Sequence, residues 1–160
     1  MGNNSQTALG CALYQELLNE SDADRILNQL IRAISASDLN LDFGILGAKY
    51  VPNALAEAGY PEVAYEMIHT TDYPGWGHWI TQGATTLWES WDGGGSQLHI
   101  MYGDVSAWMY KYLAGIQPDP ENPGFKHFYI RPFVPDDLEW VKAEHQSPFG
   151  KIVSSWKKKN

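Results

Sequence analysis

In the first third of the chain, apolar residues recur every three or four positions, and short polar breaks separate the runs. The spacing predicts a helix over about residues 5–18, capped by Asn4 or Ser5, with an apolar stripe at Ala8, Leu9, Ala12, Leu13 and Leu17. A second helix is expected over about residues 21–37, where Ser21 and Asp24 resemble a capping pair. Two helices joined by so short a break predict an αα-hairpin.

A second pair of helices follows an extended apolar stretch at residues 39–47. The third helix is expected over about residues 48–58, with Pro52 in its first turn, where the missing N–H costs nothing. The fourth is expected to begin at Pro61 and to reach about Ile68. Because the hairpin recurs after about 40 residues, the pattern predicts an αα-toroid or a helical solenoid.

The helical period disappears between residues 70 and 103, where Trp and Gly are frequent, and we expect a long functional loop there. A fifth helix is expected over residues 104–113, followed by a proline-rich linker at residues 117–124. Three short β-like runs then follow, at residues 125–131, 138–144 and 151–156. The predicted fold is mainly α: a partial toroid of αα-hairpins over residues 1–116, then a linker and the first strands of a β-sandwich over residues 117–160.

The composition of the chain argues against two classes of binding partner, nucleic acids and membranes. With 160 residues and 44% hydrophobic side chains, the chain can bury a core and is expected to be globular. Its net charge of −8 would repel a phosphate backbone, so no nucleic-acid partner is expected. No apolar run approaches the roughly 18 residues that span a bilayer, and no signal peptide is evident. We expect no membrane partner, and the compartment stays open: cytoplasmic or, for a longer parent protein, periplasmic or secreted.

The segment Trp88-Glu89-Ser90-Trp91, which precedes three glycines, is the strongest candidate for chemistry. A carboxylate between two indoles suits an enzyme that holds a sugar ring beside an acid or a base. The competing interpretation is a surface glutamate that hydrogen-bonds to loop amides. Hydrolysis of a glycosidic bond normally needs two carboxylates, and other acidic residues nearby in sequence lack a comparable context: Asp42, Asp72, Asp92 and Asp104.

Other candidates have equally plausible structural roles. His99 could sit against the same site and bond to a sugar hydroxyl, or its ring could be satisfied by loop carbonyls. Trp76, Trp79, Trp88 and Trp91 could form walls for a sugar, or pack at the mouth of a helical barrel. The histidines are not at metal-ligand spacing and Cys11 is the single cysteine, so no metal and no cofactor are expected. The run Gly93–Gly95 is interpreted as a hinge or a tight turn.

An ordered series of motifs resembles the C-terminal part of bacterial α-L-rhamnosidases, which are inverting glycoside hydrolases with an (α/α)6 barrel. The resemblance extends from about Asn4 to Ser155. Its anchors, in order, are residues 41–47 (LDFGILG), 55–59 (LAEAG), 64–65 (AY), 73–77 (YPGWG), 82–91 (QGATTLWESW), 99–103 (HIMYG), 108–116 (WMYKYLAGI) and 128–132 (FYIRP).

The resemblance implies specific roles. Glu89 matches the glutamate that acts as the general base on the attacking water, and His99 matches a histidine that lines the rhamnose site. Trp76 matches an aromatic residue near the sugar pocket, whereas Leu98 stands where the family often has Asn. The acidic motif with the family's general acid lies on earlier barrel helices and has no counterpart in these residues.

Two hypotheses follow. In the first, the chain is a fragment of an α-L-rhamnosidase that contains the general-base half of the site, releases terminal α-L-rhamnose only together with the missing half, and is inactive alone. In the second, it is a sugar-binding or structural module without catalysis, whose exposed helix faces are covered by a homo-oligomer.

Overall fold

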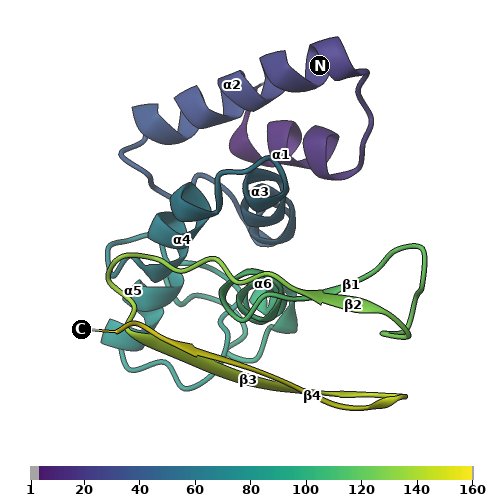
Figure 1. Ribbon diagram of the computed structural model, residues 1–160. Helices are drawn as coiled ribbons and strands as arrows, with labels where there is room; N and C mark the ends of the chain where they lie inside the picture. The colour runs from purple at the N-terminus through teal and green to yellow at the C-terminus, as the bar shows by residue number, and fades with distance from the viewer. Residues whose placement is uncertain (1–3, 160) are drawn as a thin grey trace. The chain divides into compact units, whose positions relative to one another are not determined.

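The computed structural model describes residues 4–159. The chain forms two compact units, Met1–Val105 and Ser106–Asn160. Figure 1 shows the helices of the first unit and the β-hairpins of the second. In the described part of the chain, no helix is both long and apolar enough to cross a membrane.

The first helical hairpin consists of α1 (Gln6–Tyr14) and α2 (Glu20–Ala36). Ser5 caps α1 as predicted, because its hydroxyl accepts a hydrogen bond from the Ala8 amide at 3.3 Å. The predicted cap of α2 at Ser21 is wrong. Asn19 is the cap: its side-chain oxygen accepts from the Asp22 amide at 2.9 Å, and a cap must precede the first helical residue.

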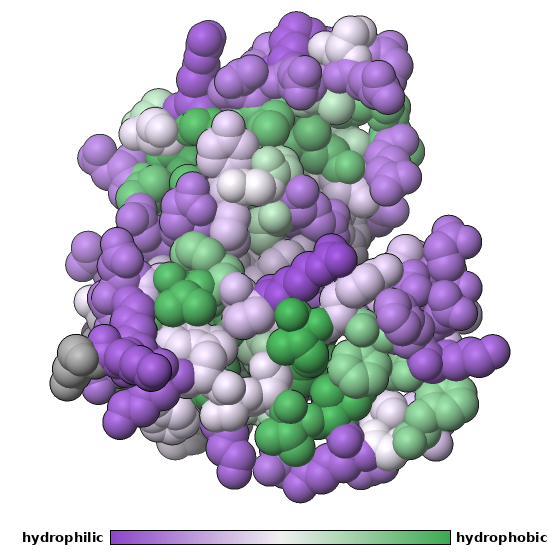
Figure 2. Space-filling model, viewed as in Figure 1, coloured by the Kyte–Doolittle hydropathy of each residue, from purple (hydrophilic) through white to green (hydrophobic). Residues whose placement is uncertain are grey.

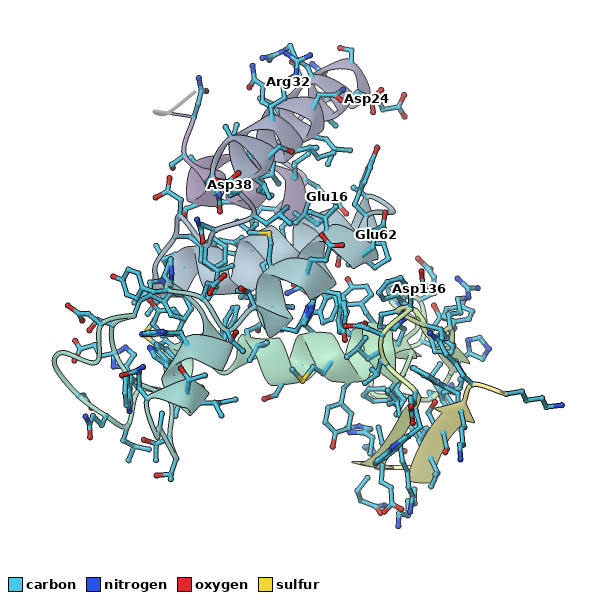
Figure 3. All side chains as sticks on the ribbon, turned by 90° about the vertical axis from the view of Figure 1, so that its left-hand side faces the viewer. Glu16, Asp24, Arg32, Asp38, Glu62 and Asp136 are labelled. Carbon is cyan, nitrogen blue, oxygen red and sulfur yellow. The ribbon has the colours of Figure 1, made fainter. Side chains whose placement is uncertain are left out.

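Amphipathicity orients α2. Ile26, Leu30 and Ile34 are buried on one face, and the labelled side chains of Asp24 and Arg32 extend outward from the helix in Figure 3. Figure 2 shows the same division: the outermost surface over α2 is hydrophilic, and hydrophobic surface lies beneath it. The helix is therefore an outer element of the first unit.

The second hairpin consists of α3 (Ile45–Glu57) and α4 (Pro61–His69), and α3 packs against α1 and α4. The predicted start of α3 is wrong, because the helix begins at Ile45 and Pro52 lies in its interior. Pro52 is among the fully buried side chains, so its packing offsets the loss of one backbone hydrogen bond. The buried face of α3 is continuous: Gly47, Ala48, Val51, Pro52, Asn53, Ala54 and Leu55.

The stretch expected as one long loop contains two short helical segments, α5 (Trp76–Thr81) and the 3₁₀ helix η1 (Ile100–Tyr102). Both are shorter than two turns, so no periodicity in the sequence could reveal them. Residues 82–99 between them have no regular secondary structure.

The helix α6 (Asp104–Trp108) begins at the end of the first unit and continues in the second unit as the π-helix η2 (Met109–Leu113). The expected linker is wrong in part, because β1 (Ile116–Pro118) lies in it and pairs antiparallel with β2 (Phe128–Ile130). The intervening loop is organised by Asp119, which is 6% exposed and accepts hydrogen bonds from Asn122, Glu121 and His127. The bond from Asn122 is the main reason why the pKa of Asp119 lies below its usual value.

The last two predicted strands are present as an antiparallel hairpin of β3 (Trp140–Ser147) and β4 (Gly150–Lys157). Ala114, Ile116 and Ile152 form the core of this unit, with Phe125, Val141 and Ala143 packed against it. Trp140, at the start of β3, is 60% exposed. Helical hairpins followed by two small antiparallel sheets confirm the predicted fold class.

Candidate active site

An aromatic cluster surrounds Trp91 in the first unit. The Trp91 ring centroid lies 4.5 Å from that of Tyr102, 4.7 Å from that of Trp79 and 5.2 Å from that of Trp76. Phe43 packs edge-on against Trp91 at 6.4 Å. Residues from three other stretches of the chain therefore meet at the Trp91 indole, which fixes the position of the loop that contains Glu89.

Indole N–H groups tie this cluster to the backbone. Trp91 donates to the Phe43 carbonyl at 2.7 Å, Trp79 donates to the Trp91 carbonyl at 3.0 Å, and Trp76 donates to the Tyr102 carbonyl at 3.2 Å. Trp76 and Trp79 are 7% and 2% exposed, so both are core residues in this structure.

Trp88 and Trp91 are half-buried and retain surface that a ligand could contact. The ring centroid of Trp88 lies 6.0 Å from that of Trp79. The predicted contact of a sugar with Trp88, Trp91 or Trp76 stays a prediction.

Glu89 is exposed, and a two-way pairing with Ser96 holds it. Its Oε2 accepts a hydrogen bond from the Ser96 amide at 2.7 Å, and its own amide donates to the Ser96 carbonyl at 2.8 Å. In the described part of the structure, no hydrogen bond engages Oε1. One carboxylate oxygen is thus held by the turn, while the side chain remains exposed and could contact a water molecule, as a general base must.

The glycines between these partners form a tight turn, as one of the two interpretations predicted. Gly95 has φ +74°, and a Cβ at this position would lie 2.5 Å from Glu89 Oε2. Only glycine meets both conditions without displacing the carboxylate. Asp92 closes the other side of the turn, where its Oδ1 accepts from the Ser90 hydroxyl at 2.6 Å and from the Gly94 amide at 3.0 Å.

Two of the carboxylates considered as a second catalytic group have structural partners. The hydrogen bond from the Ser90 hydroxyl, followed by that from the Gly94 amide, lowers the pKa of Asp92. Asp104 accepts from the buried Asn53 side chain at 2.9 Å. The lowered pKa of Asp92 is the opposite of what a protonated general acid requires.

His99 lies in the same loop as Glu89, on the other side of the glycine turn. Its amide donates to the Leu87 carbonyl at 2.8 Å, two residues before Glu89. Its ring atom Nε2 is buried, and no described residue provides a hydrogen-bond partner for it. A buried ring nitrogen without a partner can bind a polar group of a ligand. The next residue back, Leu98, is 74% exposed.

Sequence reasoning missed the backbone partners of the site. Ser96 contributes only its amide and carbonyl to Glu89, and Tyr102 and Phe43 lie far from Glu89 in the sequence. The glycine run was the one available signal for the turn. No group of three or more potential metal ligands occurs among residues 4–159.

Two sequence families match this chain. Residues 1–113 match the bacterial alpha-L-rhamnosidase 6 hairpin glycosidase domain, and residues 115–160 match the bacterial alpha-L-rhamnosidase C-terminal domain. An α-L-rhamnosidase of Alteromonas sp. (strain LOR) is 33% identical over 97% of this chain and 18% of its own length. One from Streptomyces avermitilis is 32% identical over 95% of this chain and 15% of its own length.

Solved structures agree with these matches. The crystal structure of Streptomyces avermitilis α-L-rhamnosidase complexed with L-rhamnose superposes with a TM-score of 0.93 at 30% identity, over 99% of this chain and 16% of that protein. The α-L-rhamnosidase from Dictyoglomus thermophilum gives 0.89 at 35% identity, over 97% of this chain and 18% of that protein.

These similarities confirm the predicted partial (α/α)6 toroid. The chain spans less than a fifth of the relatives' lengths. It belongs to the bacterial α-L-rhamnosidase family, because its two parts match the six-hairpin glycosidase domain and the C-terminal domain of that family.

Proposed function

We propose that this chain is the part of an α-L-rhamnosidase that contains the general base, Glu89, for the inverting release of terminal α-L-rhamnose from glycans or glycosides. The main support is the environment of the carboxylate: the Ser96 amide holds Oε2 at 2.7 Å, and the side chain as a whole is exposed, so a water molecule can reach it.

In the proposed step, Oε1 takes a proton from a water molecule as the water oxygen bonds to the anomeric carbon. The bond from that carbon to the leaving-group oxygen breaks, and a general acid protonates this oxygen. His99 Nε2 binds a sugar hydroxyl, and Trp88 and Trp91 flank the ring, with Trp76 as the packing layer behind Trp91.

An inverting hydrolase needs its acid roughly 6.5–9.5 Å from its base. Asp92 and Asp104 have structural partners, so we propose that the acid comes from outside these 160 residues and that the chain alone does not hydrolyse a rhamnoside. We also propose that the barrel region of this chain ends at residue 116.

A segment exchange tests the role of Glu89. The matching segment of the full-length Streptomyces avermitilis protein is replaced by this chain, and turnover of an aryl α-L-rhamnoside is measured. Loss of a general base lowers kcat by about 10²–10⁴-fold, so Glu89→Gln is expected to do the same. Added azide, which needs no base, should restore turnover and give a rhamnosyl azide of inverted configuration.

The matched control is Glu62→Gln, a second exposed glutamate, at the start of α4 (Figure 3). It should leave kcat unchanged. An active hybrid whose kcat is the same with Glu89→Gln would refute the proposed base. Turnover by this chain alone that disappears with Glu89→Gln would refute its proposed inactivity.

One observation favours the second candidate, a self-associating module. Ile80, Leu98 and Ile100 in the first unit are each more than 70% exposed, and apolar surface of this kind marks an interaction site. Sedimentation equilibrium decides between the candidates. A dimer that dissociates with Ile100→Lys supports the module, whereas a monomer that neither hydrolyses nor binds L-rhamnose excludes it.

A further inference from the structure

A second pocket lies within the C-terminal unit, with a volume of about 400 Å³, and the proposed hydrolysis does not use it. It is formed by η2, β1, β3 and the loop before β2. Figure 2 shows hydrophobic surface in the region of the two strand pairs. Its lining combines aromatic, apolar and polar side chains: Ala107, Tyr110, Lys111, Ile116, Pro118, Phe125, Glu144, His145 and Gln146.

The wall formed by η2 has an uncommon backbone. Met109–Leu113 is a π-helix. This conformation is rare in proteins, and where it occurs it is often at a functional site. Neighbouring side chains satisfy the carbonyls near its end: Gln117 donates to Lys111, Trp156 donates to Leu113 at 2.8 Å, and Ser154 donates to Ala114 at 2.6 Å. These bonds stabilise a helical turn that places Tyr110, 44% exposed, at the pocket.

Phe125 forms the opposite wall, also from an uncommon conformation. Its φ is +63°, in the left-handed region that residues with a Cβ rarely adopt. Its ring centroid lies 4.3 Å from that of His145, and the side chain packs against the core formed by Ala114, Ile116 and Ile152. Two rare backbone conformations thus present aromatic side chains to the same pocket.

The rim is polar and charged. Lys151 pairs with Glu144 and is the main cause of the lowered pKa of that carboxyl, with a second contribution from Lys142. Glu144 is therefore ionised at neutral pH and can accept hydrogen bonds from hydroxyl groups. The exposed Gln146 adds an amide, which both donates and accepts.

We propose that this pocket is a carbohydrate-binding site for one pyranose ring. The apolar C–H face of the sugar lies against Tyr110 and Phe125, and its hydroxyls bond to Glu144 and Gln146. An anionic ligand would be repelled by Glu144, and the two lysines beside that carboxylate disfavour a cation. A hydrocarbon would leave the charged rim without partners, so a neutral polyol with one apolar face matches the lining best.

The test is an amide ¹H–¹⁵N NMR titration of this chain with methyl α-L-rhamnopyranoside, methyl α-D-glucopyranoside and cyclohexanol. At least one pyranoside should give saturable shifts at Tyr110, Phe125 and His145 with a Kd of about 1–10 mM, a weak affinity of roughly 3–4 kcal/mol. Cyclohexanol, which has a ring but a single hydroxyl, should bind at least tenfold more weakly. Tyr110→Ala should raise the Kd at least tenfold, and Glu144→Gln about fivefold.

Tyr60→Ala is the matched control, an exposed tyrosine in the other unit, and should leave the Kd unchanged. If Tyr110→Ala does not fold, Phe125→Leu takes its place. Glu89→Gln should leave binding here intact, so failure of the proposed general base would not affect this result. No saturation up to 100 mM, equal binding of cyclohexanol, or shifts confined to the first unit would overturn the proposal.

Discussion

Substitution of Gly95 by alanine examines how the turn holds Glu89. The new Cβ would lie 2.5 Å from Glu89 Oε2, at a residue with φ +74°. The left-handed backbone costs about 1–2 kcal/mol with a Cβ, and a hydrogen bond to a charged group contributes about 1.5–3 kcal/mol. Since the turn is exposed and water can replace part of the lost bond, the lower ends apply. We expect the turn to lose about 2.5 kcal/mol.

Native-state hydrogen exchange at the Ser96 amide measures this loss directly, because that amide donates to Glu89. With 1.36 kcal/mol for each factor of ten, exchange should accelerate roughly 70-fold in Gly95→Ala. Amides in α3 should keep their rates, since the opening is local.

Substitutions at two other glycines separate the cost of the left-handed backbone from the cost of the contact with the Glu89 carboxylate. Gly83 has φ +82° and no atom near its would-be Cβ, so Gly83→Ala should accelerate exchange at Ala84 by the backbone strain alone, about 1 kcal/mol or roughly fivefold. Gly94 has no positive φ and looser contacts, at 3.3 Å or more, so Gly94→Ala should have a smaller effect at Ser96. If Gly95→Ala has no larger effect than Gly83→Ala, the contact with the carboxylate does not stabilise the turn.

Three further predictions concern stability. Because the pKa of Asp119 is lowered in the folded protein, its ionised form stabilises the fold above the unfolded pKa of about 3.9, and this stabilisation is lost as the pH falls through the folded pKa. In Asp119→Asn, the thermal unfolding temperature should therefore change less between about pH 5 and pH 2. Trp91→Ala should cost about 3–5 kcal/mol in guanidinium unfolding, whereas Trp140→Ala, at 60% exposure, should change it by less than about 0.5 kcal/mol. Asn19→Ala should cost about 1 kcal/mol and Ser21→Ala much less, measured by thermal unfolding; the reverse order would reinstate Ser21 as the cap.

Long amphipathic helices could be predicted from the sequence, and short elements could not. The apolar stripe of α2, which consists of Ile26, Leu30 and Ile34, recurs at every fourth residue and fixes its buried face. By contrast, β1 has three residues and includes Pro118, so its composition resembles a linker. Its pairing with β2 depends on contacts made across a loop, and these contacts leave no periodic pattern in the sequence.

Some residues of the candidate site could be identified from the sequence, and others could not. Glu89 and His99 were identifiable because their side chains stand in distinctive local patterns. The partner of Glu89 was not, because Ser96 acts through backbone atoms that every residue has. The burial of Trp76 and Trp79 depends on Phe43 and Tyr102, which are distant in the sequence and join the cluster only in the folded chain.

The bonds from Trp156 to Leu113 and from Ser154 to Ala114 have a consequence for how the C-terminal unit folds. They join segments about forty residues apart, so the end of the helix acquires its side-chain partners only after the last strand has been made. Loop closure of this length delays folding. During folding, the amides of the helix end and of β4 should therefore become protected from hydrogen exchange at the same time. Removal of the last few residues should raise exchange throughout the unit and not only at one edge.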